Sequence, residues 1–323
     1  MRWLTAVVLI VSALWGGYWF VGARALDGAA REWLAAQTSA GRSLTYDTLE
    51  VQGFPNRFDL TIEGPRLEDR DAGFGWTAPF LQILSLSYKP WHVIAAFPPT
   101  QTLTLPGASL TLEAQKLQAS LVMRPETRLP LERTVLIGAD LRLSGDLTLS
   151  TTELRLAARA RPEAPDSYEI GLAVSDASSP ILAQATPLPE RVQSVTVNAI
   201  AHLSAPLDRV AIQSPPHLLR LEISGAEVLW GEVSLFATGD LRADAAGQVE
   251  GSLSLRLQNW QTALTAAQSL GALSADQAAS WARAATFLAG QSEDPSQITL
   301  PLTMAQGQMF LGPLPLGPAP FLR

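Results

Sequence analysis

The chain has 323 residues, a formal net charge of -7 and no cysteine. Apolar residues make up 47% and charged residues 16%, against a usual charged share of about 25%, so the chain can bury a large core. The acidic balance supplies no basic field to collect phosphates, which argues against nucleic acid as a partner. The absence of cysteine excludes disulfides, thiolate catalysis, iron–sulfur clusters and cysteine zinc sites.

The first segment is long and apolar enough to span a membrane. Trp3–Val21 contains 19 residues and no charge, and a helix of that length rises about 28 Å, close to the roughly 30 Å hydrocarbon core. Arg2 precedes the segment, and aromatic residues gather near its far end, as in an interfacial belt. The sequence therefore predicts one transmembrane helix with the N-terminus in the cytoplasm.

A cleaved secretory signal is the competing interpretation of this segment. Ala23–Arg24–Ala25 resembles a small-x-small cleavage site, and Arg2 supplies a minimal positive region. The apolar run exceeds the usual core of about 7 to 15 residues and carries three tryptophans, which favours an uncleaved anchor. In both cases the residues after about 25 are delivered outside the cytoplasm.

The next segment predicts a stem. Ala25–Gln37 consists of good helix formers with apolar residues at helical spacing, so we expect the anchor helix to continue as an amphipathic stem that ends at Gly41. We therefore assign residues 1–40 to the anchor and stem, and residues 41–323 to a single β-rich domain.

Within that domain the dominant period is two. Apolar residues, mostly leucine, occupy every second position in segments such as Leu219–Ser224 and Gly251–Gln258, and this alternation predicts strands with one dry face and one wet face. Turn signals at short intervals predict antiparallel meanders. We therefore predict a mainly β fold in which the meander sheets form a curved or sandwich-like body.

One segment departs from this pattern. Residues 261–288 are rich in alanine, and Ser274 and Gln277 match a capping box, so we expect a short helical insert of two helices joined near Gly271. Extended chain resumes at Ile298–Met304. The closing residues 312–320 carry alternate prolines, which exclude a helix and a central strand and predict an edge element or an exposed extended segment.

Residues able to carry chemistry are sparse. The sequence has no glycine motif of a hydrolase or nucleotide-binding protein, and the acidic group Glu68–Asp71 is typical of a solvated turn, with calcium as the lesser alternative. We therefore predict no catalytic residue, no metal, no cofactor and no enzymatic activity; an enzyme built on carboxylates that the fold brings together is the least favoured class. The histidines lack the spacing of a metal or catalytic site: His92, His202 and His217.

Aromatic residues accompany glycine and proline in the first part of the domain. Gly53-Phe54-Pro55 predicts a sharp bend. The favoured interpretation of the aromatic residues is a structural corner, and the alternative is the lip of an apolar ligand groove, because rings offer large contact areas with a polar edge. The candidates for that groove are Phe54, Trp76, Phe80, Tyr88, Trp91, Trp230 and Trp260.

The sequence contains several short motifs: Gly53-Phe54-Pro55 with Arg57, Tyr88-Lys89-Pro90-Trp91, Trp230-Gly231 followed by Gly239 and Gly251, Asn259-Trp260, and Leu311–Gly317. Together they resemble the DUF2125 family of uncharacterised proteins from Gram-negative bacteria, mostly alphaproteobacteria. The resemblance covers nearly the whole chain after the anchor, and the family implies no activity that could be transferred. The pattern of one anchor and long leucine-alternating strands is also similar to AsmA-like envelope proteins, which implies a link to outer-membrane assembly and phospholipid movement.

The resemblance implies a single-pass inner-membrane protein with its bulk in the periplasm, or a periplasmic protein if the signal is cleaved. Two functions follow. In the first, the dry face of the sheet binds a lipid or another hydrophobic ligand, since a short helical insert covers little of it. In the alternative, two sheets close on each other, and an edge strand or the proline-rich tail recruits an envelope protein partner to a scaffold.

Overall fold

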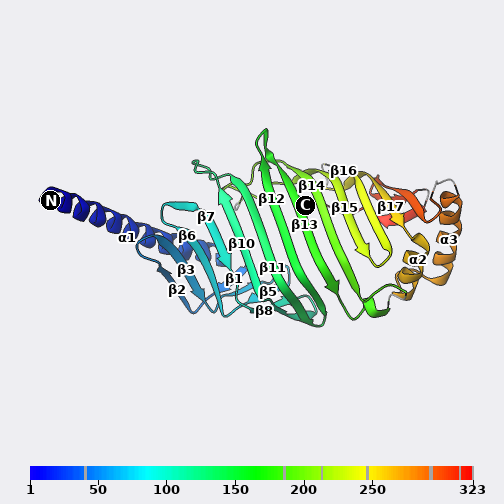
Figure 1. Cartoon of the computed structure of the whole chain (residues 1–323), viewed down its shortest axis with the longest axis horizontal. Helices are drawn as coiled ribbons and strands as arrows, with labels where there is room; N and C mark the ends of the chain where they lie inside the picture. The colour runs from blue at the N-terminus through cyan, green and yellow to red at the C-terminus, as the bar shows by residue number, and fades with distance from the viewer. Residues whose placement is uncertain are drawn as a thin grey trace. The chain divides into compact units, whose positions relative to one another are not determined.

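The computed structural model describes residues 1–39, 42–184, 187–211, 214–244, 247–290, 294–312 and 314–321. Within these ranges the chain forms three α-helices, a short 3-10 helix (Leu182–Gln184) and 20 strands (Figure 1), and every strand pairing described is antiparallel. The prediction of a mainly β fold with antiparallel meanders and a small helical insert is confirmed.

The chain separates into two compact units. The first consists of Met1–Pro125 and Leu136–Thr148, and the second of Glu126–Val135 and Leu149–Arg323. Strand β11 (Leu131–Gly145) contributes residues to both units. The boundary between an anchor and stem of residues 1–40 and a single domain of residues 41–323 stays a prediction.

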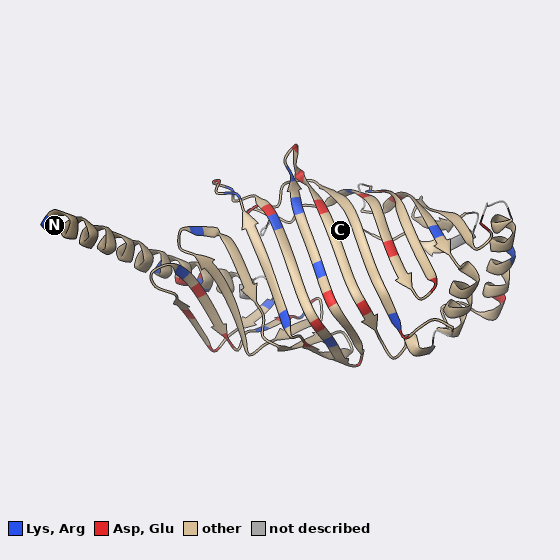
Figure 2. Ribbon diagram, viewed as in Figure 1, with Lys and Arg blue, Asp and Glu red and all other residues tan. Residues whose placement is uncertain are grey.

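Helix α1 (Arg2–Ser39) joins the predicted anchor and stem into one continuous helix. Its first 15 residues are exposed, and this part of the helix projects away from the strands of the first unit (Figure 1). Figure 2 shows no acidic or basic residue on this projecting part beyond Arg2. Among the described residues α1 is the helix that is long and apolar enough to cross a membrane, which fits an anchor and a signal sequence alike. The predicted end of the stem, Gly41, lies outside the described residues.

The strands of the first unit are short. Their bounds are β1 (Arg42–Thr45), β2 (Thr48–Gln52), β3 (Arg57–Glu63), β4 (Arg66–Asp69), β5 (Phe74–Thr77), β6 (Phe80–Leu86), β7 (Lys89–Ala96), β8 (Thr100–Leu105), β9 (Ala108–Glu113) and β10 (Lys116–Met123). They belong to one large antiparallel sheet, in which their described pairings form two ribbons with the orders β2–β3–β6–β7–β10 and β1–β4–β5–β8–β9–β11.

The core of the first unit includes the helix. Leu34 of α1 is buried together with Leu49 of β2 and with Leu60 and Ile62 of β3. These strand residues alternate with polar ones, as half-buried strands require. The part of α1 from Tyr18 onward therefore packs on the strands, while its first 15 residues are exposed.

The second unit is a meander whose long strands β12–β17 lie side by side in Figure 1. Strands from β12 to β20 pair in chain order. Their bounds are β12 (Leu149–Arg161), β13 (Ala164–Ser178), β14 (Arg191–Leu203), β15 (Leu218–Trp230), β16 (Val233–Ala243), β17 (Val249–Gln258), β18 (Gln297–Ala305), β19 (Gln308–Leu311) and β20 (Leu314–Pro318).

The predicted helical insert follows β17 as α2 (Trp260–Ser269) and α3 (Ala275–Ala289). The predicted capping box is present, since the Gln277 N–H donates to Ser274 Oγ at 3.3 Å and the Ser274 N–H donates to Gln277 Oε1 at 2.9 Å. The proline-rich tail contains β20, whose described ladder is with β19 alone. This agrees with the predicted edge element.

Candidate apolar binding sites

Alternate residues of the second unit build one apolar face across seven strands, from β12 to β18. Because side chains directly opposite each other in a sheet point to the same face, the strand register defines rows of neighbours that cross the sheet. The middle row consists of Leu156, Leu172, Val197, Ala226, Ala237, Leu255 and Leu300, each opposite the next.

Three further rows on the same face are equally apolar. Each has one residue from every strand, and no charged side chain occurs in any of them. The alternation in the sequence therefore becomes a continuous apolar surface. The three rows are Ala158–Ile170–Ala199–Ile223–Gly239–Leu253–Leu302, Leu154–Val174–Val195–Val228–Leu235–Leu257–Ile298, and Ala160–Tyr168–Ala201–Leu221–Leu241–Gly251–Met304.

One border of this face is covered by chain segments of the second unit. Tyr168 is 2% exposed, and its hydroxyl accepts a hydrogen bond of 2.8 Å from the Leu207 N–H. Leu241 is buried with Ala319, which belongs to the C-terminal segment. The row that contains Tyr168 and Leu241 is thus an ordinary core.

The opposite border is covered by the helical insert. Ile298 is buried in a cluster with Trp260 of α2 and with Ala285 and Ala289 of α3. Trp260 donates its indole N–H to the Pro295 carbonyl at 3.1 Å, so its polar atom is satisfied. The insert therefore packs on the sheet through apolar contacts.

Between the two borders the face is only partly covered. No member of the middle row is buried, and Leu156 is 43% exposed. Leucine on an apolar face is normally enclosed by a second layer, so the middle row is an apolar surface that the described residues leave partly accessible to solvent.

A cavity of about 460 Å³ lies at the helical border of this strip. Its volume is within the range of about 300 to 1,000 Å³ that is typical of sites for small ligands. Leu257, Ile298 and Leu300 belong both to its lining and to the rows of the apolar face. The other lining residues are Trp260, Ala263, Leu264, Ala267, Ala272, Leu273, Trp281, Ala285, Leu311 and Leu316.

The first unit holds a separate cavity of about 340 Å³. Both ribbons of the unit and the stem part of α1 contribute residues to it, so α1 forms one wall. The only charged residue of the lining is Arg66, whose guanidinium donates to Asp47 Oδ1 at 3.0 Å. The lining consists of Ala30, Trp33, Leu34, Leu44, Leu60, Ile62, Pro65, Arg66, Leu67, Trp76, Leu81 and Ile83.

Two of the seven predicted groove aromatics line these cavities. Trp260 lines the cavity of the second unit, and Trp76 lines that of the first. Trp76 donates its indole N–H to Gln101 Oε1 at 2.9 Å, and Gln101 is itself buried. Rings with satisfied polar edges in apolar walls are common in ligand pockets.

The other five aromatics lie elsewhere. Phe80 and Trp91 are partly buried in β6 and β7, and Trp230 donates its indole N–H to the Pro189 carbonyl at 2.7 Å. Phe54 and Tyr88 are exposed at the tips of connections between strands. The assignment of all seven to one groove stays a prediction. Trp33 and Leu34 also line the cavity of the first unit, but they belong to none of the sequence motifs. The apolar stripe of the predicted stem was the sequence feature that pointed to them.

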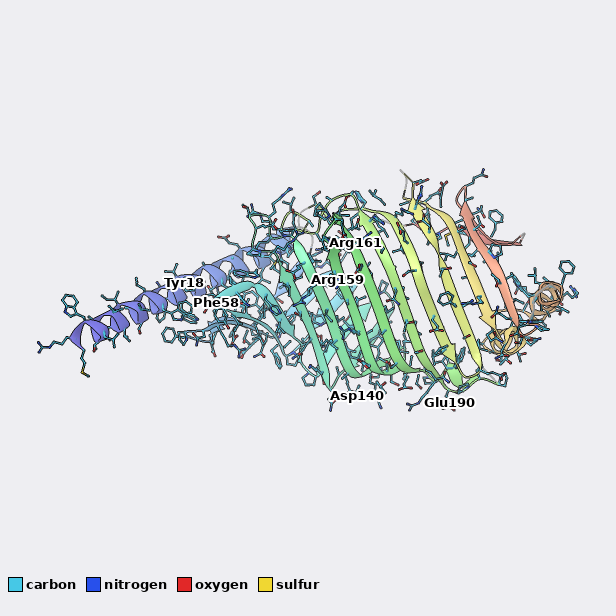
Figure 3. All side chains as sticks on the ribbon, turned by 45° about the horizontal axis from the view of Figure 1, so that its top comes forward. Tyr18, Phe58, Asp140, Arg159, Arg161 and Glu190 are labelled. Atoms are coloured by element: carbon cyan, nitrogen blue, oxygen red, sulfur yellow. The ribbon has the colours of Figure 1, made fainter. Side chains whose placement is uncertain are left out.

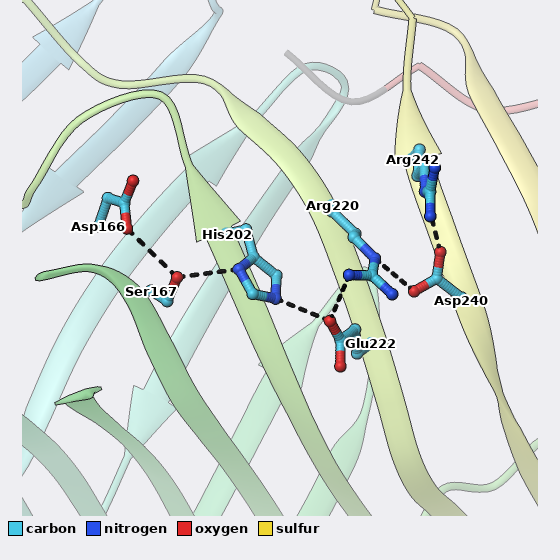
Figure 4. Close-up of polar contacts among 7 residues, drawn as sticks. All are labelled: Asp166, Ser167, His202, Arg220, Glu222, Asp240 and Arg242. Carbon is cyan, nitrogen blue, oxygen red and sulfur yellow. Dashed lines mark hydrogen bonds and ion pairs between the residues drawn. The ribbon is translucent and has the colours of Figure 1, made fainter. Parts of the chain in front are cut away.

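The opposite face of the second unit carries charge. A chain of polar contacts runs across it (Figure 4). The His202 ring lies 2.9 Å from Ser167 Oγ through Nδ1 and 3.0 Å from Glu222 Oε1 through Nε2. Arg220 continues the chain of contacts, at 2.7 Å from Glu222 and 2.6 Å from Asp240. Arrangements of serine, histidine and a carboxylate occur in hydrolases.

The burial and the strand register of these residues are typical of a structural network. Ser167 is 1% exposed, so a substrate cannot reach its hydroxyl. Ser167, His202 and Arg220 lie directly opposite one another on β13, β14 and β15, and cross-strand polar pairs of this kind stabilise a wet sheet face. Among the described residues no group of three or more histidine, aspartate or glutamate side chains could hold a metal ion.

Comparisons with known proteins assign the chain to a family. The search of curated proteins found no match, and the search of solved structures found none either. Residues 19–320 match the model of DUF2125, which is described as an uncharacterised protein conserved in bacteria. Since this match spans nearly the whole chain, the protein belongs to the DUF2125 family.

Proposed function

We propose that this protein is anchored in the inner membrane, that its bulk lies in the periplasm, and that the apolar face of its second unit binds a lipid acyl chain or a similar hydrophobic ligand. The observation that carries the proposal is the accessible middle row of that face. Large contiguous apolar surface is rare on soluble monomers and usually marks a binding site.

The dimensions of the face suit an acyl chain. A row of seven residues on neighbouring strands about 4.8 Å apart extends about 29 Å across the sheet, perpendicular to the strands. One leaflet of the hydrocarbon core is about 15 Å thick, so an acyl chain fits within the row. Each methylene group that leaves water contributes about 0.8 kcal/mol. A ligand covering the middle row would thus replace the missing second layer.

The packing of α1 supports an uncleaved anchor. Trp19 and Ala23 are buried against Phe58 of β3. Cleavage near Ala23–Arg24–Ala25 would remove these contacts and interrupt a continuous helix. Burial of a residue as large as tryptophan contributes on the order of 3 kcal/mol or more. Trp19 and Ala23 therefore support the folded first unit, and Trp19 also belongs to the apolar run.

The alternative function is a non-enzymatic scaffold in the envelope. It is favoured by β20, whose free side among the described pairings could add a strand from a partner. Deleting residues 313–323 would then weaken the capture of an envelope partner, with circular dichroism as the control for folding, because Ala319 of this segment is buried with Leu241. The similarity to AsmA-like proteins and the absence of enzymatic activity are further hypotheses.

The lipid proposal is tested with a variant that lacks residues 2–14. This deletion removes exposed apolar residues and keeps Tyr18 and Trp19, which contact the first unit. The variant is purified without detergent, and bound lipid is measured by native mass spectrometry and by fluorescence of an apolar dye. We expect co-purified lipid and saturable dye binding. A folded protein with neither would exclude the proposal, and the intact mass of the native protein reports signal cleavage directly.

A further inference from the structure

The contact between α1 and the strands of the first unit begins within the apolar run Trp3–Val21. The Tyr18 hydroxyl donates to the Ser87 carbonyl at 2.6 Å, and the Trp19 indole N–H donates to the Arg57 carbonyl at 2.6 Å. Within the apolar run, only the residues Trp3–Gly17 precede these contacts. Fifteen helical residues rise about 22 Å, which is shorter than the roughly 30 Å hydrocarbon core. The helix can therefore cross the bilayer fully only if the contacting strands approach the membrane.

Two strand connections lie at this level of the helix. They are the loop between β2 and β3, which contains Phe54, and the turn between β6 and β7, which contains Tyr88. The Ser87 N–H of the turn donates to the Asn56 carbonyl of the loop at 2.9 Å, so the two tips are joined to each other. Figure 3 shows Tyr18 and Phe58 where α1 meets these strands.

The side chains of the tips are aromatic and accessible. Phe54 is 56% exposed and Tyr88 is 53% exposed. The Phe54 ring centre lies 5.4 Å from that of Trp19 and 5.6 Å from that of Phe20, which is also 56% exposed. Exposed rings that surround the end of an apolar helix have the composition of an interfacial belt, where amphipathic rings are stabilised at the headgroup level.

Basic residues adjoin these rings. Lys89 follows Tyr88 at the start of β7, and Arg24 lies on α1 beyond the apolar run; both are exposed. Arg57 follows the β2–β3 loop and is paired with Asp59 at 3.0 Å. Basic groups at this depth can reach lipid phosphates while their stems stay near the rings.

We propose that the β2–β3 loop and the β6–β7 turn are themselves embedded in the membrane interface, so that the first unit contacts a phospholipid bilayer directly and α1 is one of three contacts. This inference rests on the proposed membrane anchoring and adds a binding surface to it. It also gives the first unit a fixed orientation, with the two tips at the bilayer.

The opposite end of the first unit supplies a control position. Arg42 contacts Gln37 of α1 at 3.2 Å and Asp69 of β4 at 3.1 Å. Gln37 follows Tyr18 by 19 residues, or about 28 Å along the helix axis. Asp71 is exposed in the turn after β4, so it is expected well outside the interface.

The absence of cysteine allows a direct depth measurement in the full chain. Single variants Phe54→Cys, Tyr88→Cys, Leu9→Cys and Asp71→Cys are labelled with an environment-sensitive fluorophore and reconstituted in phosphatidylethanolamine–phosphatidylglycerol nanodiscs. Quenching by doxyl lipids and by aqueous iodide is compared. We expect lipid quenching at positions 54 and 88, with iodide quenching about threefold or more below that at position 71.

Two results would overturn the inference, and they have different meanings. If position 88 is as accessible to iodide as position 71 while position 9 is quenched by lipid, the anchor stands and the tips lie in water. If position 9 is also accessible to iodide, the membrane anchoring itself fails. Circular dichroism verifies that each variant is folded. Tyr88→Cys removes a solvent-exposed side chain, so it keeps the test decisive if Phe54→Cys disturbs the packing on α1.

Discussion

A charge placed on the apolar face separates ligand binding from folding. We choose Leu156→Asp, because Leu156 belongs to the middle row and is 43% exposed. The matched control is Leu229→Asp. Leu229 lies on the opposite face, directly across from Ser194 and Ser234, and is 37% exposed. The two substitutions are chemically identical, occur in the same unit and remove similar amounts of buried surface.

The expected magnitudes follow from these exposures. Full burial of leucine contributes about 1.5 to 3 kcal/mol. Slightly more than half of each side chain is buried, so each substitution should lower the free energy of unfolding by about 1 to 2 kcal/mol. Only at position 156 would a bound acyl chain also cover the new carboxylate. The desolvation of that group should weaken binding by about 1.4 kcal/mol or more, which is at least tenfold.

The assay combines two measurements on the variant that lacks residues 2–14. Urea unfolding gives the stability change, and titration with a fluorescent fatty acid gives the dissociation constant. We expect similar unfolding midpoints for the two substitutions and weaker binding for Leu156→Asp alone. Equal affinities, or an equal loss in Leu229→Asp, would refute the assignment of the ligand to this face.

Three further predictions concern stability. Gly251 has φ +139° and an added Cβ would lie 2.1 Å from a backbone oxygen, so Gly251→Ala should cost about 2 kcal/mol or more; Gly171→Ala, which meets no atom within 4 Å, should change stability by less than about 1 kcal/mol in the same urea titration. Ser274→Ala removes the N-cap of α3 and should cost about 1 kcal/mol, measured as a lower thermal midpoint; an unchanged midpoint would mean that α3 does not contribute to global stability. Hydrogen bonds from the side chain and backbone N–H of Ser296 hold the pKa of Asp294 below its ordinary value. The unfolded state therefore binds more protons between the two pKa values, and the contribution of Asp294 is present above about pH 4 and lost below the folded pKa. Asp294→Asn should thus be less stable than the native chain at pH 7, with a difference that closes as the pH falls below about 4; a pH-independent difference would contradict this linkage.

Local patterns in the sequence were sufficient for the fold class. The alternation of Leu253, Leu255 and Leu257 predicted a strand with one dry face, and all three now lie on the apolar face of the second unit. The capping box of Ser274 and Gln277 located the start of α3. Such signals are reliable because they depend on neighbours within a few residues, where backbone geometry alone decides which side chains share a face.

The candidate site could be predicted only in part. Tyr168 and Leu156 both occupy dry positions, yet the first is 2% exposed and the second 43%. The alternation of apolar and polar residues assigns each residue to one face of the sheet, but it does not predict which segment covers that face. The covering segment at Tyr168 comes from Leu207, 39 residues further along the chain. Only tertiary packing decides such a difference.

The N-terminal helix shows the same division between sequence and structure. The sequence alone was sufficient to recognise the apolar run as long enough to span a membrane and to recognise the family motifs. The sequence could not show that Trp19 packs against Phe58 within that run, because residues that favour lipid also favour a protein core. The sequence therefore determined where apolar surface occurs, while the tertiary structure decided which part is buried by the protein and which part is left accessible to a ligand or a membrane, because burial depends on contacts between segments that are distant in the chain.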